Sequence, residues 1–528
     1  MPLGAESLLD VLAAHDVEVV FGLPGVHNLA IWEALRKQPG IRMIGVRHEQ
    51  TAVYAADGYA RATGKLGVAV VTTGPGAANT LGATGEAWAS GSPVLVIATD
   101  IPSTLRRPGV HRGVLHETRD QRAMFVPVTK AAFDVPSAQG LAAYADKAVR
   151  QALHSPHGPV YLGVPTDFLS TETPRHTVAE VEPSRTVPDL AEAGRLVAAS
   201  SRPLIWAGGG AARSGAGFAI GTLAAKLQAP IITTYGARGL TDSPLVVRGP
   251  AHAPPVGKLW DDADLVIAIG TDFDGMMTQN WSQPQPPALV AVNIDKAEAN
   301  KNYPADVTLE GDAATVTAAL AAAVSPKEGA CDVEAVNAEV RALAEEDSPD
   351  AAKLLRALEG TDATIVVDMC IPGYWIGGFH HVTHPRGLAY PVGWGTLGFG
   401  FPAAIGAAVA HRTVAVVGDG GFLFACGDLA TVKQEGLPLT IVLVDDGGYG
   451  MLRYDQQIAN HTITGVDLTR PDFAKLAESF GIPAVTLNGF DDLRTALDAS
   501  DGPSMIVVNA SLKPPLNTSP RWYRRTTT

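Results

Sequence analysis

Two acidic, glycine-rich turns are the part of the sequence best suited to chemistry. Asp419 lies in Gly-Asp-Gly-Gly (418–421), and Asp446 lies in Asp-Asp-Gly-Gly (445–448). Two carboxylates at neighbouring strand ends can hold one hard cation, and glycine amides can hold phosphate oxygens around it. Either motif alone is also compatible with an ordinary strand-helix-strand unit whose glycines only make turns. Their spacing, which leaves room for one full crossover, favours a binding site.

The segments around the two turns predict how the carboxylates are positioned. Residues 414–417 and 439–444 are apolar, β-branched runs typical of buried parallel strands. Residues 422–435 predict a helix, which Gly436-Leu437-Pro438 ends. Ligands of open α/β sheets bind at the carboxyl ends of the strands. We therefore expect both acidic turns at that edge of one sheet.

This pattern resembles the metal and diphosphate motif of thiamine diphosphate (ThDP) enzymes, in which Gly-Asp-Gly is followed by an Asn-Asn pair and a glycine-rich turn. The resemblance implies that Asp419, the Asp446 side chain and the Gly448 carbonyl bind Mg²⁺. The sequence departs from the family pattern at Asp445-Asp446, which adds negative charge beside a diphosphate. The implied cofactor contacts in this region are Gly418, Asp419, Gly420, Gly421, Asp446, Gly448, Tyr449 and Met451.

Glu49 is the catalytic candidate in the N-terminal part of the chain. An acid at the start of a helix most often only faces the helix dipole. However, Arg-His-Glu-Gln-Thr-Ala-Val-Tyr-Ala-Ala-Asp-Gly-Tyr-Ala-Arg (47–61) resembles the pyrimidine-domain signature of ThDP enzymes. Gly-Leu-Pro-Gly (22–25) precedes it and Thr-Thr-Gly-Pro-Gly-Ala-Ala-Asn (72–79) follows it, in the order of the family. The cofactor contacts implied here are Pro24, Gly25, Glu49, Gly74 and Asn79.

The resemblance gives the Glu49 carboxyl a defined task. The cofactor's own 4′-amino group takes the proton from thiazolium C2, and it is basic enough only as the imino tautomer. A carboxyl bonded to N1′ across the ring favours that tautomer. We therefore expect Glu49→Gln to lose much activity and little cofactor binding.

His27 and His116 are candidate acid-base groups. For a single histidine, a surface or helix-end position is the more common interpretation. His27 follows the Gly-Leu-Pro-Gly turn, which the resemblance places near the thiazolium ring. His116 lies in Leu-His-Glu (115–117), where acetolactate synthases tend to carry Phe-Gln-Glu. The surrounding residues are instead similar to those of guanidino-oxo-acid decarboxylases.

A glycine- and aromatic-rich stretch, residues 392–406, precedes an alanine-rich segment. Such a stretch can simply allow close helix-to-sheet packing. It is also similar to the ThDP-enzyme segment that places a bulky aliphatic residue between the two cofactor rings. Leu397 matches that residue, and Gly395 matches the residue whose carbonyl receives the 4′-amino group. A wedge of this kind brings the reacting atoms together.

Length and composition set the class of protein. The chain has 528 residues, which suggests about three domains. Alternating strand and helix patterns predict an α/β fold of three doubly wound parallel-sheet domains: pyrimidine-binding (1–170), middle (190–325) and diphosphate-binding (353–528). Residues 171–190 and 326–352 are expected to be linkers, the second with a helical piece. A glycine-rich turn at 207–214 lacks nucleotide-binding spacing, so FAD is not expected.

Charge and targeting patterns exclude several classes of function. The net charge of −14 and the lack of a basic run argue against nucleic acid as a partner. The N-terminus has an amphipathic pattern rather than a signal peptide, and no apolar run reaches transmembrane length. We therefore expect a cytoplasmic protein without a membrane partner. Its three cysteines are too far apart in sequence for a disulfide framework or a metal knuckle.

Together these features predict a ThDP- and Mg²⁺-dependent enzyme that decarboxylates a 2-oxo acid non-oxidatively through an enamine, with possible carboligation. An acetolactate-synthase-like carboligase is the first alternative. A non-catalytic ThDP-binding protein is the second, with Asp445-Asp446 as its support. Because the family joins the glutamate of one subunit to the diphosphate site of another, the resemblance also implies a homodimer or homotetramer with inter-subunit active sites.

Overall fold

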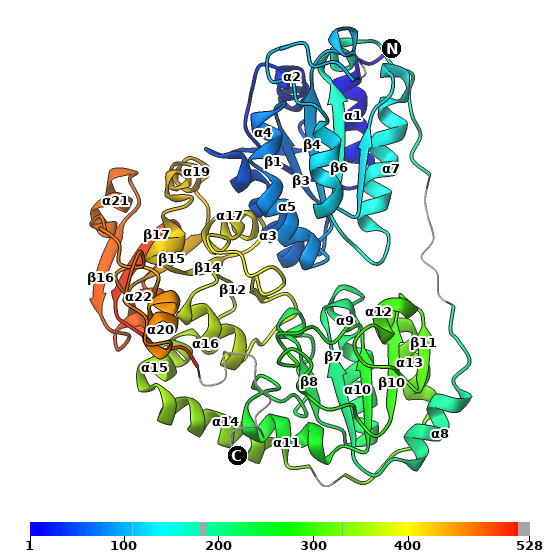
Figure 1. Cartoon of the computed structure of the whole chain (residues 1–528), viewed down its shortest axis with the longest axis vertical. Helices are drawn as coiled ribbons and strands as arrows, with labels where there is room; N and C mark the ends of the chain where they lie inside the picture. The colour runs from blue at the N-terminus through cyan, green and yellow to red at the C-terminus, as the bar shows by residue number, and fades with distance from the viewer. Residues whose placement is uncertain (108, 180–185, 330, 516–528) are drawn as a thin grey trace.

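The computed structural model describes residues 1–107, 109–179, 186–329 and 331–515. Within these ranges the chain forms three parallel sheets, each in its own α/β layer structure (Figure 1). The N-terminal sheet is drawn in blue and cyan, the middle sheet in green, and the C-terminal sheet in yellow to red. The predicted fold class is therefore confirmed. The predicted domain bounds remain predictions, and the last domain includes residues 516–528, which lie outside the described part.

The N-terminal sheet is covered on both faces. Val68 and Val70 pack into one buried cluster with α1 and α7, whereas Ala69 and Val71 pack into another with α3. This alternation follows from the two-residue period of a strand. In spatial order the strands are β2 (Arg42–Gly45), β1 (Val19–Gly22), β3 (Gly67–Val71), β4 (Val94–Asp100), β6 (Val160–Pro165) and β5 (Ala131–Asp134). The helices are α1 (Gly4–Ala14), α2 (Leu29–Lys37), α3 (Glu49–Thr63), α4 (Pro75–Ala78), α5 (Leu81–Ala89), α6 (Gln121–Phe125) and α7 (Leu141–Leu153).

The middle sheet contains the glycine-rich turn at 207–214. A Cβ on Gly208 would lie 2.4 Å from the Gly270 carbonyl oxygen, so the glycines let two backbone turns touch. Close packing thus accounts for this turn. In spatial order the strands are β11 (Val307–Glu310), β10 (Leu289–Asn293), β9 (Leu265–Ile269), β7 (Pro203–Ala207) and β8 (Ile231–Thr233). The helices are α8 (Ala191–Ala199), α9 (Gly209–Arg213), α10 (Gly217–Leu227), α11 (Pro254–Asp262), α12 (Lys296–Asn300) and α13 (Ala313–Ala323).

The C-terminal sheet carries the two acidic turns. In spatial order its strands are β13 (Leu388–Ala389), β12 (Thr364–Val367), β14 (Thr413–Gly418), β15 (Leu439–Asp445), β17 (Ser504–Asn509) and β16 (Ala484–Asn488). The helices are α14 (Val333–Asp347), α15 (Pro349–Leu358), α16 (Ile371–Phe379), α17 (Gly400–Ala410), α18 (Asp419–Phe422), α19 (Leu429–Glu435), α20 (Gly450–Ile458), α21 (Phe473–Ser479) and α22 (Leu493–Asp498). The strands predicted on both sides of the crossover are present as β14 and β15.

The predicted helix over 422–435 is wrong in its first half. The chain forms the short helix α18 at 419–422, a 3₁₀ turn at 426–428, and then α19. Asp428 explains the break, because its buried carboxylate accepts hydrogen bonds from the Arg47 backbone N–H and the Thr51 hydroxyl of the N-terminal domain. The end at Gly436 is confirmed, since this glycine has a φ of 58° and caps α19 in the left-handed conformation.

The segment at 326–352, predicted as a linker with a helical piece, contains such a helix. Most of it forms α14, and α15 follows directly, with Ser348 capping α15. Val333 and Val340 of α14 pack into a buried cluster with the middle domain, which gives the segment a reason to be helical. The predicted linker at 171–190 includes residues 180–185, which lie outside the described part of the chain.

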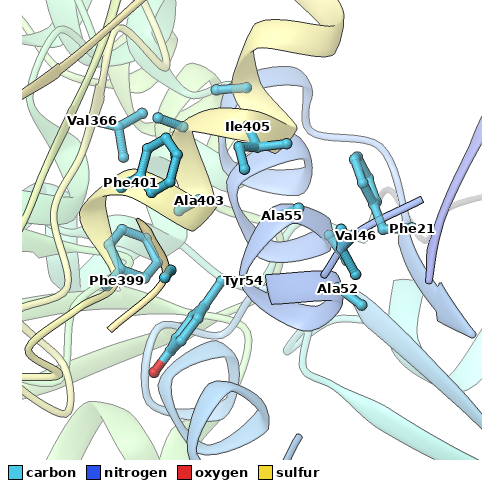
Figure 2. Packing of buried hydrophobic residues seen from close by; sticks show 14 of the residues in the cluster. Phe21, Val46, Ala52, Tyr54, Ala55, Val366, Phe399, Phe401, Ala403 and Ile405 are labelled. Carbon is cyan, nitrogen blue, oxygen red and sulfur yellow. The ribbon is translucent and has the colours of Figure 1, made fainter. Parts of the chain in front are cut away.

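Helices α3 and α17 join the N-terminal domain to the C-terminal domain. Figure 2 shows them side by side, with Tyr54 of α3 beside Phe399, just ahead of α17. A Cβ on Gly58 would lie 1.9 Å from the Ala403 carbonyl oxygen, and one on Gly406 would lie 1.7 Å from the Ala55 carbonyl oxygen. The two backbones therefore touch where glycines occur. Their contact makes one continuous core from the two domains.

The sequence contains no apolar run of transmembrane length, and the helices of the structure can be compared with that prediction. Among the described helices, none combines the length and the apolar composition that crossing a bilayer requires.

Candidate active site

Asp419 and Asp446 follow the ends of two neighbouring strands. β14 pairs with β15 in parallel register, with Gly418 opposite Val444. Asp419 is 1% exposed. Burial, and then the charge of Asp446, raises the pKa of Asp419 to about 7. Burial also raises the pKa of Asp446, against the opposing charge of Arg453. The strand ends therefore place two carboxylates close enough to repel each other.

Each of these carboxylates has one buried oxygen without a hydrogen-bond partner among the residues described, and these oxygens indicate whether a metal ion fits. Asp419 Oδ2 and Asp446 Oδ1 are buried and have no hydrogen-bond partner within the described residues. A buried carboxylate oxygen without a partner is costly unless a cation or a proton satisfies it. In the described part of the chain no third histidine, cysteine or acid joins the pair. Backbone and phosphate oxygens would complete the shell of a hard cation such as Mg²⁺, so these residues fit the metal.

The glycines of the two turns allow close packing of the backbone. A Cβ on Gly420 would lie 2.7 Å from the Tyr449 ring, and one on Gly448 would lie 2.0 Å from the Val466 carbonyl oxygen. Gly448 also has a φ of 146°, which favours glycine. Backbone amides of glycine-rich turns suit anionic oxygens. The composition of the two turns is therefore compatible with the phosphate end of the cofactor.

Arg470 and Arg453 stabilise the second acidic turn. Arg470 Nη1 donates to Asp445 Oδ1 at 2.6 Å, and Arg453 donates to the carbonyl oxygens of Asp446 and Gly447. Arg453 also pairs with Asp467. The added negative charge at 445 thus has a cation beside it. Arg453 is therefore bound to the turn.

Asp368 is a positioning residue that we did not predict. It lies at the end of β12, where its fully buried carboxylate accepts N–H bonds from Met369, Gly398 and Phe399. Burial raises the pKa of Asp368 to about 6, although these amides act in the opposite direction. An acid at the carboxyl end of a central strand was the available sequence signal.

Leu397 and Gly395 lie in the loop that Asp368 holds. A Cβ on Gly421 would lie 2.4 Å from Asp368 Oδ2 and 3.0 Å from Leu397 Cδ1, so this loop lies directly against the acidic turn. Gly395 is exposed and has a φ of 74°, a conformation that favours glycine. The structure thus brings Leu397 and Gly395 to the same edge as Asp419.

Met451 and Tyr449 lie beside the same turn. Met451, on α20, packs against the buried cluster that contains Ile371 and Trp375. The Tyr449 ring lies over Gly420. Cys370, in a segment to which we assigned no contact, is next to Gly418, whose added Cβ would lie 3.3 Å from the Cys370 Cβ.

Glu49 is the first residue of α3. His48 caps this helix by accepting from the Gln50 backbone N–H. Glu49 Oε2 accepts a hydrogen bond of 3.0 Å from Asn79 Nδ2, and Glu49 Oε1 lies 3.4 Å from the position of a Cβ on Gly76. The carboxylate is partly exposed. The fold therefore joins Glu49 to the 72–79 turn, as a shared site requires.

Asn28 holds the Gly-Leu-Pro-Gly turn, and we did not predict it. Its side chain is buried, accepts from the Gly25 N–H at 2.8 Å and donates to the Leu23 carbonyl at 3.0 Å. A Cβ on Gly25 would lie 2.6 Å from Thr72, so this turn packs on the 72–79 turn. Pro24 is exposed at its tip. Asn side chains commonly bond the backbone of turns, so an Asn just after the Gly-Leu-Pro-Gly turn was the sequence feature that could have predicted this role.

His27 and His116 lie edge to face, with ring centroids 5.3 Å apart. Both Nδ1 atoms are buried without a partner in the described structure. Burial, and then His116, lowers the pKa of His27, while Asp100 acts in the opposite direction. His116 has a φ of 67°, and its carbonyl carbon and oxygen lie against Gly74. The two predicted acid-base groups are therefore neighbours.

Gln121 is a third positioning residue missed from sequence. Its Oε1 accepts from the Gly74 N–H at 2.7 Å, and its Nε2 donates to the Thr99 carbonyl and the Tyr161 hydroxyl. The side chain is buried, and its bonds fix the 72–79 turn relative to β4. No local sequence motif marks it, because its partners are far away along the chain.

The predicted residues form two groups within one chain. One group surrounds Glu49 in the N-terminal domain, and the other surrounds Asp419 in the C-terminal domain. Gln50 donates to the Phe424 carbonyl, and Thr396 donates to Glu86 of α5. Both groups therefore border the interface between the same two domains.

Three family models match the chain in the order of its sheets. The "Thiamine pyrophosphate enzyme, N-terminal TPP binding domain" matches residues 3–124, the central domain matches 190–320, and the C-terminal TPP binding domain matches 370–508. Thiamine pyrophosphate is another name for ThDP. Each model matches strands of a different sheet.

Curated relatives match over almost the whole chain. A probable 2-ketoarginine decarboxylase of Pseudomonas aeruginosa is 36% identical, over 95% of this chain and 92% of its own length. A probable acetolactate synthase large subunit of Methanocaldococcus jannaschii is 31% identical, over 94% of this chain and 89% of its own. The acetolactate synthase isozyme 2 large subunit of Escherichia coli is 31% identical, over 96% and 95%. This chain is thus a member of the thiamine pyrophosphate enzyme family.

Proposed function

We propose that this enzyme catalyses the ThDP- and Mg²⁺-dependent, non-oxidative decarboxylation of a 2-oxo acid. The observation that carries the proposal is the pair of buried, unpartnered oxygens of Asp419 and Asp446, set in two closely packed glycine-rich turns. When bound, the cofactor supplies a carbon nucleophile and a cationic ring that accepts the electrons released with CO₂. The chain itself supplies binding, orientation and proton control.

The C-terminal residues would hold the phosphate end of the cofactor. Asp419, Asp446 and the Gly448 carbonyl bind Mg²⁺, and the amides of Gly420 and Gly421 face the diphosphate oxygens. Leu397, in contact distance of Gly421, provides the apolar wedge that sets the orientation of the rings. Asp368 fixes this wedge through the amides of its loop. A loop held in place by these bonds lowers the entropy that must be lost on reaching a reactive arrangement.

The N-terminal residues would control protons. Glu49, oriented by Asn79, donates a hydrogen bond to the pyrimidine nitrogen as an acid, which favours the basic tautomer of the cofactor. His27 and His116 would hold or deliver the proton that the product carbon needs. Since burial keeps the pKa of His27 below its ordinary value, His27 is neutral near pH 7 and can accept a proton.

The proposed substrate class is a 2-oxo acid with a basic side chain. The Leu-His-Glu stretch at 115–117 is similar to guanidino-oxo-acid decarboxylases, and one of the relatives is named a probable 2-ketoarginine decarboxylase. Asp100, at the end of β4, forms an ion pair with Arg106, so this acid is not a free contact for a cationic substrate tail.

Product analysis tests the proposal. The protein, with ThDP and Mg²⁺, is incubated with pyruvate, with unbranched longer 2-oxo acids and with 5-guanidino-2-oxopentanoate, and CO₂, aldehyde and acyloin are measured. Decarboxylation predicts an aldehyde and CO₂ in equal amounts, with the guanidino acid as the best substrate. Acyloin from pyruvate as the main product would instead support an acetolactate-synthase-like carboligase. The two relatives with 31% identity are named as acetolactate synthase subunits and support this alternative.

A non-catalytic ThDP-binding role is the remaining alternative. Its support was the acidic pair Asp445-Asp446, and the ion pair of Asp445 with Arg470 weakens that support. Exchange of the C2 hydrogen of bound ThDP in D₂O, followed by NMR, separates the two roles. Faster exchange than in free ThDP supports catalysis, and an unchanged rate supports mere binding.

We also propose that two chains complete each active site. Glu49 and Asn79 are partly or fully exposed. Exposed apolar side chains also follow Gly25, which packs on the 72–79 turn, and occur in the C-terminal domain: Val26, Leu29, Trp394 and Phe424. A second copy would cover them. Mixing two inactive variants, Glu49→Gln and Asp419→Asn, tests this arrangement. Partial recovery of activity after subunit exchange supports shared sites, and no recovery supports sites within one chain.

A further inference from the structure

A small cavity lies between the middle and C-terminal domains, apart from the candidate active site. Its volume is about 10 Å³, enough for a single water-sized guest. The loop after β8 forms one wall and the segment after α16 forms the other. The charged or ionisable residues that line it are Arg238, Arg248, His380 and His381.

Arg238 is the most constrained of these residues. It is 7% exposed. Its Nη2 donates to the Gly378 carbonyl at 2.9 Å, and its Nη1 donates to the Thr233 hydroxyl at 3.4 Å. Its Nε has no hydrogen-bond partner in the parts of the chain that the structure describes. Burial lowers the pKa of Arg238 to about 10, so the guanidinium remains charged at neutral pH. A buried cation bound to neutral groups alone is costly.

The groups around Arg238 add donors and positive charge. His380 is 5% exposed and His252 is 7% exposed, and each has a buried Nδ1 without a partner among the described residues. Burial is the main cause that lowers the pKa of both histidines, and Arg238 adds to it. Arg238 and Arg248 also lower the pKa of His381.

Two acidic residues of the described structure interact with neighbours of Arg238, but not with Arg238 itself. Glu334 interacts with Arg248, and Asp274 interacts with Tyr235 next to Arg238. Within the described structure, neither acid forms a salt bridge with Arg238 or with a histidine of the cluster. The cavity therefore combines a buried cation, free donors and no counter-charge.

We propose that this cavity binds a monatomic anion, a halide such as chloride, between the Arg238 guanidinium and the His380 ring. The anion would accept from the free donors and neutralise the buried arginine. The size of the cavity favours a halide over sulfate or phosphate, whose four oxygens need more room.

The site would link the two domains. Arg238 belongs to the middle domain, and it already bonds the Gly378 carbonyl of the C-terminal domain. Gly239 packs so closely on the C-terminal domain that a Cβ there would lie 2.3 Å from the His384 carbonyl oxygen. An anion held from both sides would therefore stabilise this domain interface, since it binds the folded state and not the unfolded one.

Diffraction from crystals soaked in sodium bromide tests the site directly in the unaltered protein. We expect an anomalous bromide peak between Arg238 and His380, retained at millimolar bromide. A peak seen only at molar bromide marks an adventitious ion and overturns the proposal, as does an empty cavity.

Thermal unfolding at constant ionic strength gives a second test. With sodium gluconate as the reference salt, chloride or bromide should raise the Tm of the full chain by about 2 °C at a concentration ten times the Kd. Sulfate should not reproduce this rise. Arg238→Gln and His380→Gln should abolish the halide effect, whereas Arg195→Gln, on the exposed surface of α8, should retain it. Equal responses to sulfate and bromide, or an unchanged halide response in a folded Arg238→Gln or His380→Gln protein, would overturn the proposal.

Discussion

Asp445 and Arg470 form an ion pair of 2.6 Å directly beside the two carboxylates proposed to hold Mg²⁺. The family pattern has an uncharged residue at 445, so the sequence alone suggested an excess of negative charge near a diphosphate. Arg470 offsets that excess. The pair thus explains how this chain can differ from the pattern at 445 and keep the same type of site.

The first prediction follows from this ion pair. Arg470→Gln leaves the Asp445 charge unpaired, so the Kd for ThDP at saturating Mg²⁺ should rise by about 3- to 10-fold. The double variant Arg470→Gln with Asp445→Asn should restore the affinity. Isothermal titration calorimetry measures both. If the single and double variants bind ThDP equally weakly, the charge of Asp445 is not the cause.

The second prediction concerns Glu49. Glu49→Gln keeps the hydrogen-bonding shape toward Asn79 but loses the acid, so kcat should fall by about 10²- to 10⁴-fold. The Kd for ThDP should change by about 3-fold or less, because the phosphate end provides most of the binding in this proposal. Glu18→Gln, in an exposed pair with Lys65, serves as the control. Full turnover by Glu49→Gln would remove this residue from the mechanism.

The third prediction compares two glycines of the same turn region. A Cβ on Gly421 would meet Asp368 at 2.4 Å and Leu397 at 3.0 Å, whereas one on Gly427 would meet nothing within 4 Å. Gly421→Ala should therefore displace the Leu397 loop, lower stability by about 1–3 kcal/mol and reduce ThDP affinity. Gly427→Ala should behave like the wild type in thermal unfolding and in ThDP titration. Similar results for both variants would show that the turn tolerates a side chain at 421.

The fourth prediction concerns the pH dependence of stability in a halide-free buffer. Burial lowers the pKa of His252 and of His380 to about 4. The folded protein keeps both rings neutral while unfolded histidine, with a pKa near 6.5, takes up a proton. Stability is therefore fully present above pH 6.5 and is lost as the pH falls toward 4, by up to about 1.4 kcal/mol per pH unit for each ring.

His380→Gln isolates this contribution from other titrating groups. The variant should show a flatter fall in Tm between pH 6.5 and 4.5 than the wild type. His411→Gln, a histidine at the end of α17 outside this cluster, is the matched control and should follow the wild type. Parallel Tm curves for His380→Gln and the wild type would show that His380 does not titrate in this way.

Local patterns in the sequence were enough to predict much of the fold. The strands predicted at 414–417 and 439–444 match β14 and β15 to within one residue at each end, because a run of apolar residues buried on both sides needs only the identity of its own residues. The strands that were not predicted include β5, β11, β13 and β16, which lie at sheet edges and contain partly buried residues, so their own composition marks them weakly. The buried strands β6 and β12 were also not predicted.

Other errors came from contacts that no local pattern contains. The helix expected over 422–435 is broken where Asp428 bonds the N-terminal domain, so a tertiary contact outweighs the local preference. The helical piece expected within 326–352 is present as α14, but its packing on the middle domain was not predicted.

The sequence by itself determined the kind of chemistry, because Glu49, Asp419 and Asp446 occur in motifs whose residue types and order the cofactor requires. The tertiary structure alone decided what supports them. Asp368, Gln121 and Arg470 each bond a partner that lies 25 to 47 residues away along the chain. A hydrogen bond depends on distance in space, and only folding brings such residues together. For the same reason, the uncompensated charge of Arg238 became visible only once its surroundings were known.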